Sequence, residues 1–167
     1  ELNKGEYSEE IERTTPLSQP YSSQVAEKPV FAKRKDGFKN ILILDTETTG
    51  LSPSKDELLQ FSAIDGNGTP LLDSYIKPQH RRSWKKAQAK NHITPDTVKD
   101  APNFSEIKDK VQKLIDNADL IISYNGKFDM DFLQMNGIKV NPETPHLDVM
   151  KAFRKIDRER PADGSKL

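Results

Sequence analysis

The 167-residue sequence contains no cysteine, which excludes disulfide bonds, thiolate metal sites and cysteine nucleophiles. It has no apolar stretch approaching the roughly 18 residues that predict a membrane-spanning helix, and no recognisable signal peptide. An absence of cysteine is also typical of a reducing compartment. Together these absences predict a cytoplasmic protein with no membrane partner.

The sequence also lacks a net charge, because 26 basic residues balance 26 acidic ones. Overall charge therefore favours neither nucleic acid nor membrane as a partner. Only local clusters of charged residues can indicate which partner binds. Only 34% of the residues are hydrophobic, which suggests that a solvated segment dilutes an ordinary core. A chain of this length is expected to form one domain, with room for an appendage.

That solvated segment is expected at residues 1–38, which are rich in Glu, Ser, Thr and Pro. So few apolar residues cannot offset the entropy of ordering the chain unless the segment docks elsewhere. We interpret residues 1–38 as a linker or tail. One interpretation is that this segment connects the folded domain to another domain upstream. The remaining residues, 39–167, are expected to form the folded domain.

The domain shows a mixed α/β pattern. Ile41–Leu44 is a continuous apolar run typical of a central strand, and two further strands are predicted on either side of the Gly66–Gly68 turn. Thr94 and Asn103 are predicted to cap helices. The remaining predicted elements are a strand at 120–125, a helix at 127–137 and a last helix that starts at 146.

Two carboxylates, Asp45 and Glu47, directly follow the apolar run in the stretch ILILDTETTG. Alternate residues of a strand share a face, so both side chains are expected to point the same way, with Thr46 opposite. Two neighbouring carboxylates repel each other, and a divalent cation such as Mg²⁺ or Mn²⁺ relieves that repulsion. Taken alone, the pair could equally be solvated acids in a surface turn.

A second group follows a later strand, in YNGKFDMDF. Asn125 and Gly126 leave the strand, and Asp129 lies in the first turn of the next helix, where the helix dipole favours a carboxylate in any case. The combination of DTETTGL with NGKFD resembles the first two motifs of the DEDD, or DnaQ-like, 3′–5′ exonucleases, which include proofreading subunits of replicative polymerases. The resemblance runs from about residue 39 to 153 and includes ITPDTVKDAPNFSEI and HLDVMKAF.

This resemblance implies a ribonuclease H-like exonuclease fold, with helices flanking a mixed central sheet, and phosphodiester hydrolysis at DNA 3′ ends. Asp45, Glu47 and Asp129 would be the catalytic metal ligands for two Mg²⁺ or Mn²⁺ ions, which together activate water and stabilise the leaving oxygen. The partner would be a single-stranded or frayed DNA end. The residues that the resemblance places against nucleic acid are Thr48, Leu51, Asn91, His92, Asn125 and Phe128.

The third motif of the family, a His or Tyr followed by a fourth acid, is not found in the sequence. None of His80, His92 and His146 has an acid five residues later. One interpretation is that a further segment completes the site. The alternative is a catalytically impaired exonuclease-like module that binds or docks on nucleic acid.

Two further features leave alternatives open. The run KPQHRRSWKKAQAK contains six Lys or Arg and no acid, so it could track phosphates with Trp84 stacking on a base, or form a solvated surface with Trp84 packed inward. The tether before the domain resembles fusions in which a DnaQ-like domain follows a CRISPR-adaptation subunit and trims spacer precursors. The proofreading domain of a replicative polymerase is the competing context.

Overall fold

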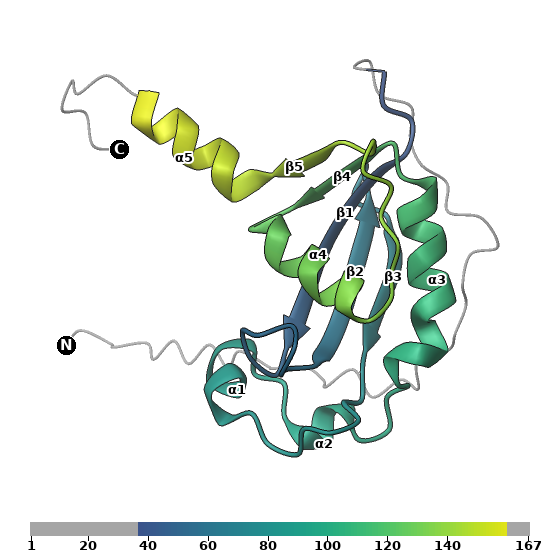
Figure 1. Cartoon of the computed structure of the whole chain (residues 1–167), viewed down its shortest axis with the longest axis vertical. Helices are drawn as coiled ribbons and strands as arrows, with labels where there is room; N and C mark the ends of the chain where they lie inside the picture. Colours follow the sequence, from purple (N-terminus) through teal and green to yellow (C-terminus); the bar gives the residue numbers. More distant parts are fainter. Residues whose placement is uncertain (1–36, 160–167) are drawn as a thin grey trace, which may run out of the picture.

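The computed structural model describes residues 37–159, which build one five-stranded sheet in the order β3-β2-β1-β4-β5 (Figure 1). The predicted tether, up to residue 36, and the last eight residues lie outside the described part. The strands are β1 (Ile41–Thr48), β2 (Leu58–Asp65), β3 (Pro70–Tyr75), β4 (Leu120–Ser123) and β5 (His146–Asp148).

β1 is the central strand, as its apolar run predicts. It pairs antiparallel with β2 on one side and parallel with β4 on the other. The predicted turn between β2 and β3 is confirmed. Asp65 accepts hydrogen bonds of 2.8 Å from the backbone N–H groups of Asn67 and Thr69, and Gly68 adopts the positive φ of 86° that favours glycine. The sheet is therefore mixed.

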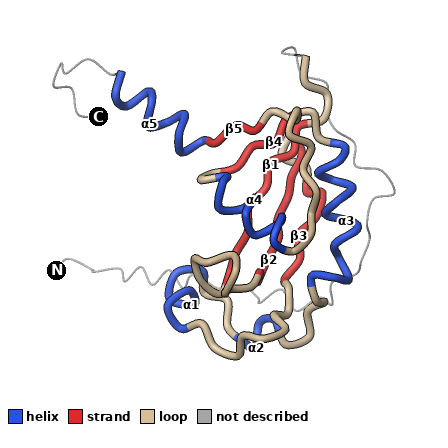
Figure 2. Tube along the Cα trace, viewed as in Figure 1, coloured by secondary structure: helices blue, strands red, loops and turns tan. Residues whose placement is uncertain are grey.

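Within residues 37–159, five helices lie between or after the strands (Figure 2): α1 (Lys85–Asn91), α2 (Pro95–Val98), α3 (Phe104–Asn117), α4 (Gly126–Met135) and α5 (Val149–Glu159). Two predicted caps are confirmed. Thr94 forms a reciprocal capping box with Thr97 at α2, and Asn103 forms one with Glu106 at α3. Gly137, at φ 80°, follows the end of α4.

Two elements differ from the sequence prediction. Residues 85–91 form a helix where no helix was expected, in a stretch of Lys, Ala and Gln that all favour helix. The predicted last helix does not start at residue 146, because His146–Asp148 instead form β5, parallel to β4. Pairing with β4 satisfies the backbone groups on one side of this edge strand, and α5 begins only at Val149.

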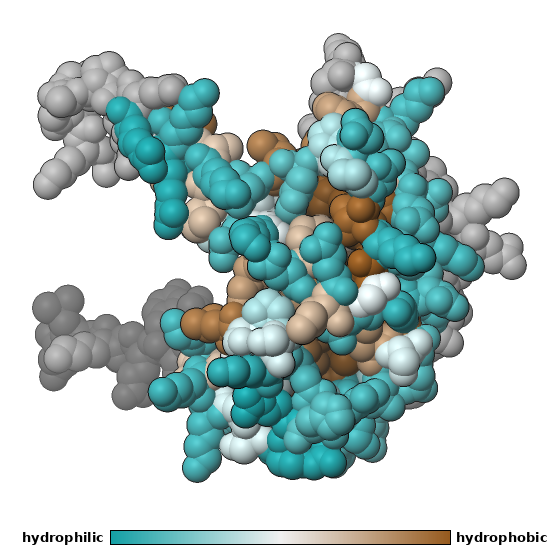
Figure 3. Space-filling view, viewed as in Figure 1, coloured by the Kyte–Doolittle hydropathy of each residue, from teal (hydrophilic) through white to brown (hydrophobic). Residues whose placement is uncertain are grey.

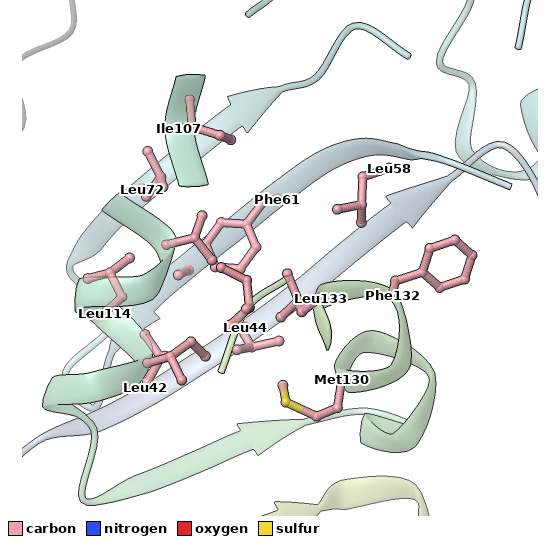
Figure 4. Close-up of a cluster of buried hydrophobic side chains, with 14 of the residues drawn as sticks. Leu42, Leu44, Leu58, Phe61, Leu72, Ile107, Leu114, Met130, Phe132 and Leu133 are labelled. Carbon is pink, nitrogen blue, oxygen red and sulfur yellow. The ribbon is translucent and has the colours of Figure 1, made fainter. Parts of the chain in front are cut away.

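The main core lies between one face of the sheet and the helices α3 and α4 (Figure 4). Leu42 and Leu44 of β1 are buried there, and Phe132 and Leu133 of α4 are fully buried. α3 presents the face that its sequence pattern predicts, namely Ile107, Val111, Leu114 and Ile115. Because α4 packs on β1 through these contacts, the first turn of α4 is held beside the end of β1.

A smaller core, formed by Leu59, Trp84, Ile93 and Val98, lies beneath α1 and α2. Trp84 is buried, and its indole Nε1–H donates a 2.7 Å hydrogen bond to the carbonyl of Ile93. Trp84 therefore packs inward and is not available to stack on a base. This decides between the two interpretations of that residue.

α5 extends away from the sheet after β5 (Figure 1). Its apolar residues Val149, Phe153 and Ile156 are exposed. None of the helices in residues 37–159 has the length and apolar character needed to cross a membrane.

Candidate active site at the end of the central strand

The end of β1 alternates between inward and outward side chains. Asp45 is exposed and Glu47 is half-buried, whereas Thr46 between them is buried. Asp45 lies opposite Ser62 of β2 and Glu47 opposite Gln60, and the register then shifts between Glu47 and Thr48. Both carboxylates therefore lie on the same face, as the strand period predicts.

Asp129 joins this strand end from α4. Its side chain is only 1% exposed. One of its oxygens, Oδ1, accepts a hydrogen bond from the backbone N–H of Thr46 at 3.0 Å and another from the Thr46 hydroxyl at 2.7 Å. The structure thus brings together two acid-bearing segments that are 83 residues apart in sequence.

The electrostatics of the three carboxylates all favour protonation. Partial desolvation by neighbouring protein atoms raises the pKa of Asp45, although the residue is exposed, and it also raises the pKa of Glu47. Repulsion by Asp45 adds to the rise in the pKa of Glu47. Burial also raises the pKa of Asp129 to about 6. The hydrogen bonds from Thr46 oppose this rise, and repulsion by Asp45 adds to it. A positive charge bound here would favour ionisation of all three groups.

These side chains fit a hard divalent cation that keeps part of its water shell. Residues 37–159 contain no group of three His, Cys, Asp or Glu side chains that could hold an ion. Mg²⁺ usually takes one or two carboxylates and completes its shell with water and substrate phosphate. Asp45 and Glu47 offer such a carboxylate pair, and Asp129 lies near enough to Asp45 to feel its charge.

A cavity of about 590 Å³ opens beside the carboxylates, of which Glu47 lines it and Asp45 and Asp129 do not. Its wall contains four of the predicted site residues together with Glu47: Thr48, Leu51, Asn91 and Phe128. A volume in this range is typical of pockets that hold small molecules. A second cavity, of about 360 Å³, lies between the 53–57 loop and the start of α3 and includes none of the three carboxylates.

The cavity combines apolar and polar walls. Leu51 is 85% exposed, and Phe128 packs on Phe132 with ring centroids 4.9 Å apart. The Thr48 hydroxyl donates a 2.6 Å hydrogen bond to the carbonyl of Gly50. Leu51 and Phe128 could therefore contact the flat faces of a base, and the oxygen of Thr48 can still accept a hydrogen bond.

Asn91 connects α1 to the strand end. Its side-chain amide donates a 3.2 Å hydrogen bond to the carbonyl of Thr48, and its oxygen accepts from the backbone N–H of Ile93 at 3.1 Å. Asn91 also hydrogen-bonds the carboxylate of Glu47, which lowers the pKa of that group against the effect of burial. It therefore orients an acid of the site.

The other predicted residues lie further out. Asn125 has left-handed backbone angles, with φ 58°, and its N–H donates to Asp148 at 3.2 Å, which holds the start of α4. His92 is exposed at the end of α1 and does not line the cavity. His146 contacts the hydroxyl of Ser123 through Nε2 at 2.7 Å, also away from the cavity wall.

Sequence reasoning missed three residues here. Thr46 holds Asp129, and Lys86 and Lys90 of α1 both line the cavity. A buried threonine between two acids was visible in the strand pattern, but its partner 83 residues away was not. The two lysines are four residues apart, a signal that acquires meaning only once residues 85–91 are known to be helical.

The sequence profile of the exonuclease family designated RNase_T matches residues 42–166. The DNA polymerase III of PolC type from Staphylococcus epidermidis is 28% identical over 140 residues, which cover 81% of this chain. The enzyme of the same name from Thermotoga maritima is 28% identical over 126 residues, or 72% of the chain. The matched region makes up only 10% and 9% of these two relatives.

Solved structures of exonuclease I share the fold. A product-bound form superposes with a TM-score of 0.63 and 22% identity, over 74% of this chain and 33% of that protein. The Escherichia coli enzyme in complex with a dA16 oligonucleotide gives a TM-score of 0.62 and 21% identity, over 73% of this chain and 30% of the enzyme. The expected ribonuclease H-like exonuclease fold is thereby confirmed.

Proposed function

The chain belongs to the RNase_T family of exonucleases, and on that basis we propose that it hydrolyses phosphodiester bonds from the 3′ ends of DNA in a metal-dependent reaction. The observation that carries the proposal is the pair Asp45 and Glu47 at the end of β1, with Asp129 of α4 close enough to Asp45 to be affected by its charge. The pKa values of all three are raised, and a cavity adjoins Glu47. Clusters of carboxylates that burial and mutual repulsion destabilise are typical of functional sites.

The proposed role of each residue follows from its position. Asp45 and Glu47 would hold a cation on the open face of β1, and Asp129 would contribute from α4 while Thr46 keeps its carboxylate in place. When bound, two divalent cations would supply a polarised water and charge stabilisation for the leaving oxygen. The terminal nucleotide would occupy the adjoining cavity, against Leu51 and Phe128.

A general base is not assigned to any residue of the described part. The wall of the cavity beside the carboxylates includes no histidine or tyrosine from residues 37–159. His92 is exposed and His146 bonds Ser123, so neither one is placed to accept a proton from water between the carboxylates.

The direction of hydrolysis is tested with full-length protein and two labels. With single-stranded DNA labelled at the 3′ end, the first product should be a labelled mononucleotide. With the same strand labelled at the 5′ end, a ladder of progressively shorter products should appear. Both should require Mg²⁺ or Mn²⁺ and stop in EDTA. Early release of a 5′-labelled mononucleotide would contradict the proposed polarity.

We propose two biological contexts for this activity. The similarity to PolC-type polymerases supports a proofreading role, in which mispaired primer ends are removed. Trimming of CRISPR spacer precursors is the other context that the sequence suggests. Preference for a frayed, mispaired 3′ terminus over a long 3′ overhang would favour proofreading, and the reverse preference would favour trimming.

A further inference from the structure

Helix α1 places two lysines on the wall of the cavity beside the carboxylates. Lys86 and Lys90 both line it, and their spacing of four residues puts them one turn apart on the same face of the helix. Lys85, the neighbour of Lys86 in the same helix, does not line it. In the space-filling view, the surface over α1 and α2 is mainly hydrophilic (Figure 3).

Lys86 and Lys90 form no ion pair with any acid of residues 37–159. Two acids line the same cavity, Glu47 and Asp56, and each has another partner, since Glu47 is hydrogen-bonded by Asn91 and Asp56 pairs with Arg81. Arg81, from the same basic run, differs because it pairs with Asp56 at 3.0 Å.

α1 is tied to the strand that carries the acids, so the lysines keep a defined position relative to them. The Asn91 side chain bonds the carbonyl of Thr48 at the end of β1. Trp84, just before α1, is buried and bonds the carbonyl of Ile93 just after it. The helix is thus fastened on both sides of the two lysines.

The cavity therefore has three chemically different parts. Glu47 marks the end at which the proposed cations and the scissile phosphate belong. Leu51 and Phe128 offer apolar surface suited to a base, and Lys86 and Lys90 supply positive charge. Because the scissile phosphate is assigned to the carboxylates, Lys86 and Lys90 are available to bind a second phosphate of the same strand.

We propose that Lys86 and Lys90 bind the phosphodiester adjacent to the scissile one, so that this site binds strands in preference to single nucleotides. The inference rests on the proposed function, because it presumes that a strand end enters the cavity. Lysine acts as a point charge toward phosphate and needs no fixed fork geometry. The two residues are positioning residues and do not touch the reacting atoms.

Binding tests this inference without requiring turnover. A fluorescent oligothymidylate is titrated in EDTA with full-length protein, K86A/K90A and the matched control K85A, over a range of salt concentrations. We expect K86A/K90A to bind about tenfold more weakly at low salt. Its plot of log affinity against log salt should be shallower by about 0.7, the change expected when one phosphate contact on a single strand is lost. K85A should match the unaltered protein.

A substrate modification locates the contact. An oligonucleotide that carries a neutral methylphosphonate at the linkage next to the terminal one lacks the proposed partner charge. The unaltered protein should lose about tenfold in affinity on this strand, and K86A/K90A should lose little more. Full additivity of the two changes, or equal affinity and salt slope for K86A/K90A and K85A, would overturn the inference.

A kinetic comparison separates this inference from the proposed function. The p-nitrophenyl ester of thymidine 5′-phosphate carries only the scissile phosphate, so K86A/K90A should hydrolyse it with unchanged KM while the KM for the oligonucleotide rises. A raised KM for both substrates would contradict the assignment to the adjacent phosphate. An unaltered protein that is inactive on both substrates with Mg²⁺ and Mn²⁺ would refute the proposed function, while the binding experiment would still decide the role of the lysines.

Discussion

Thr46 and Asp129 form a two-point contact in which the backbone N–H and the hydroxyl of the threonine both donate to one carboxylate oxygen, at 3.0 and 2.7 Å. Both residues are buried. Hydrogen bonds to an ionised acceptor are stronger than neutral ones, so this contact fastens the first turn of α4 to the end of β1. It fixes the position of Asp129 relative to Asp45 and Glu47.

Replacing Thr46 with valine tests that contact. Valine keeps the shape and the backbone donor but removes the hydroxyl, so the free energy of unfolding at pH 7 should fall by about 1–3 kcal/mol. The ionised form of Asp129 loses a donor, and its pKa should rise further. The acid limb of the activity profile should therefore move to higher pH. Urea unfolding and a pH–rate profile measure the two effects.

Thr46→Ser is the matched control because it keeps the hydroxyl and loses only a methyl group. Its acid limb should coincide with that of the unaltered protein. Should T46V and T46S show the same pH profile, the hydroxyl would have no influence on Asp129.

Asp129 should make the metal-free protein less stable as the pH rises. Its pKa is raised from 3.8 to about 6 in the folded chain, so between these values the folded state binds more protons than the unfolded state. Stability is therefore highest below the lower value and is lost as the pH rises through the window. The D129N variant has no charge to ionise at this position, so it avoids the loss of stability that ionising the buried Asp129 causes. Its free energy of unfolding at pH 7 should be higher by about 1–3 kcal/mol.

The measurement is urea unfolding in EDTA at several pH values from 4 to 7. The pKa values of Asp45 and Glu47 are also raised, so the quantity compared is the difference between D129N and the unaltered protein. That difference should be larger at pH 7 than at pH 4. A difference independent of pH would show that Asp129 does not titrate in this window.

Trp84 should report a buried environment that DNA does not change. It is the single tryptophan of the chain, is 5% exposed and bonds the Ile93 carbonyl. Its emission should be blue-shifted and poorly quenched by acrylamide, and saturating oligonucleotide should leave its intensity nearly unchanged. Strong quenching by a bound strand would mean that the ring stacks on a base.

Much of the fold follows from local pattern. The apolar run of β1, the turn between β2 and β3, the capped start of α3 and its buried face are all short-range features, in which composition and period agree with the final structure. The predicted start of the last helix at residue 146 was wrong, because His146–Asp148 form a three-residue strand that depends on its neighbour β4 and has no period of its own.

In the candidate site, too, local sequence pattern predicts some features and not others. Alternation in β1 predicts that Asp45 and Glu47 share a face, and the burial of these residues agrees with that prediction. No local pattern shows that Thr46 meets Asp129 or that Lys86 and Lys90 line the cavity, because these contacts depend on how α4 and α1 pack against β1. The catalytic roles of the acids stay predictions.

The most direct test compares D45N with D73N in full-length protein, using 3′-labelled single-stranded DNA and Mg²⁺ or Mn²⁺. Both residues are exposed acids, and Asp73 lies on the same face of the sheet, since both are register partners of Ser62. D45N should release nucleotides at least about a hundredfold more slowly, because loss of a ligand should cost at least as much as loss of its outer-shell partner. D73N should retain activity. Equal release by D45N and the unaltered protein would contradict the account.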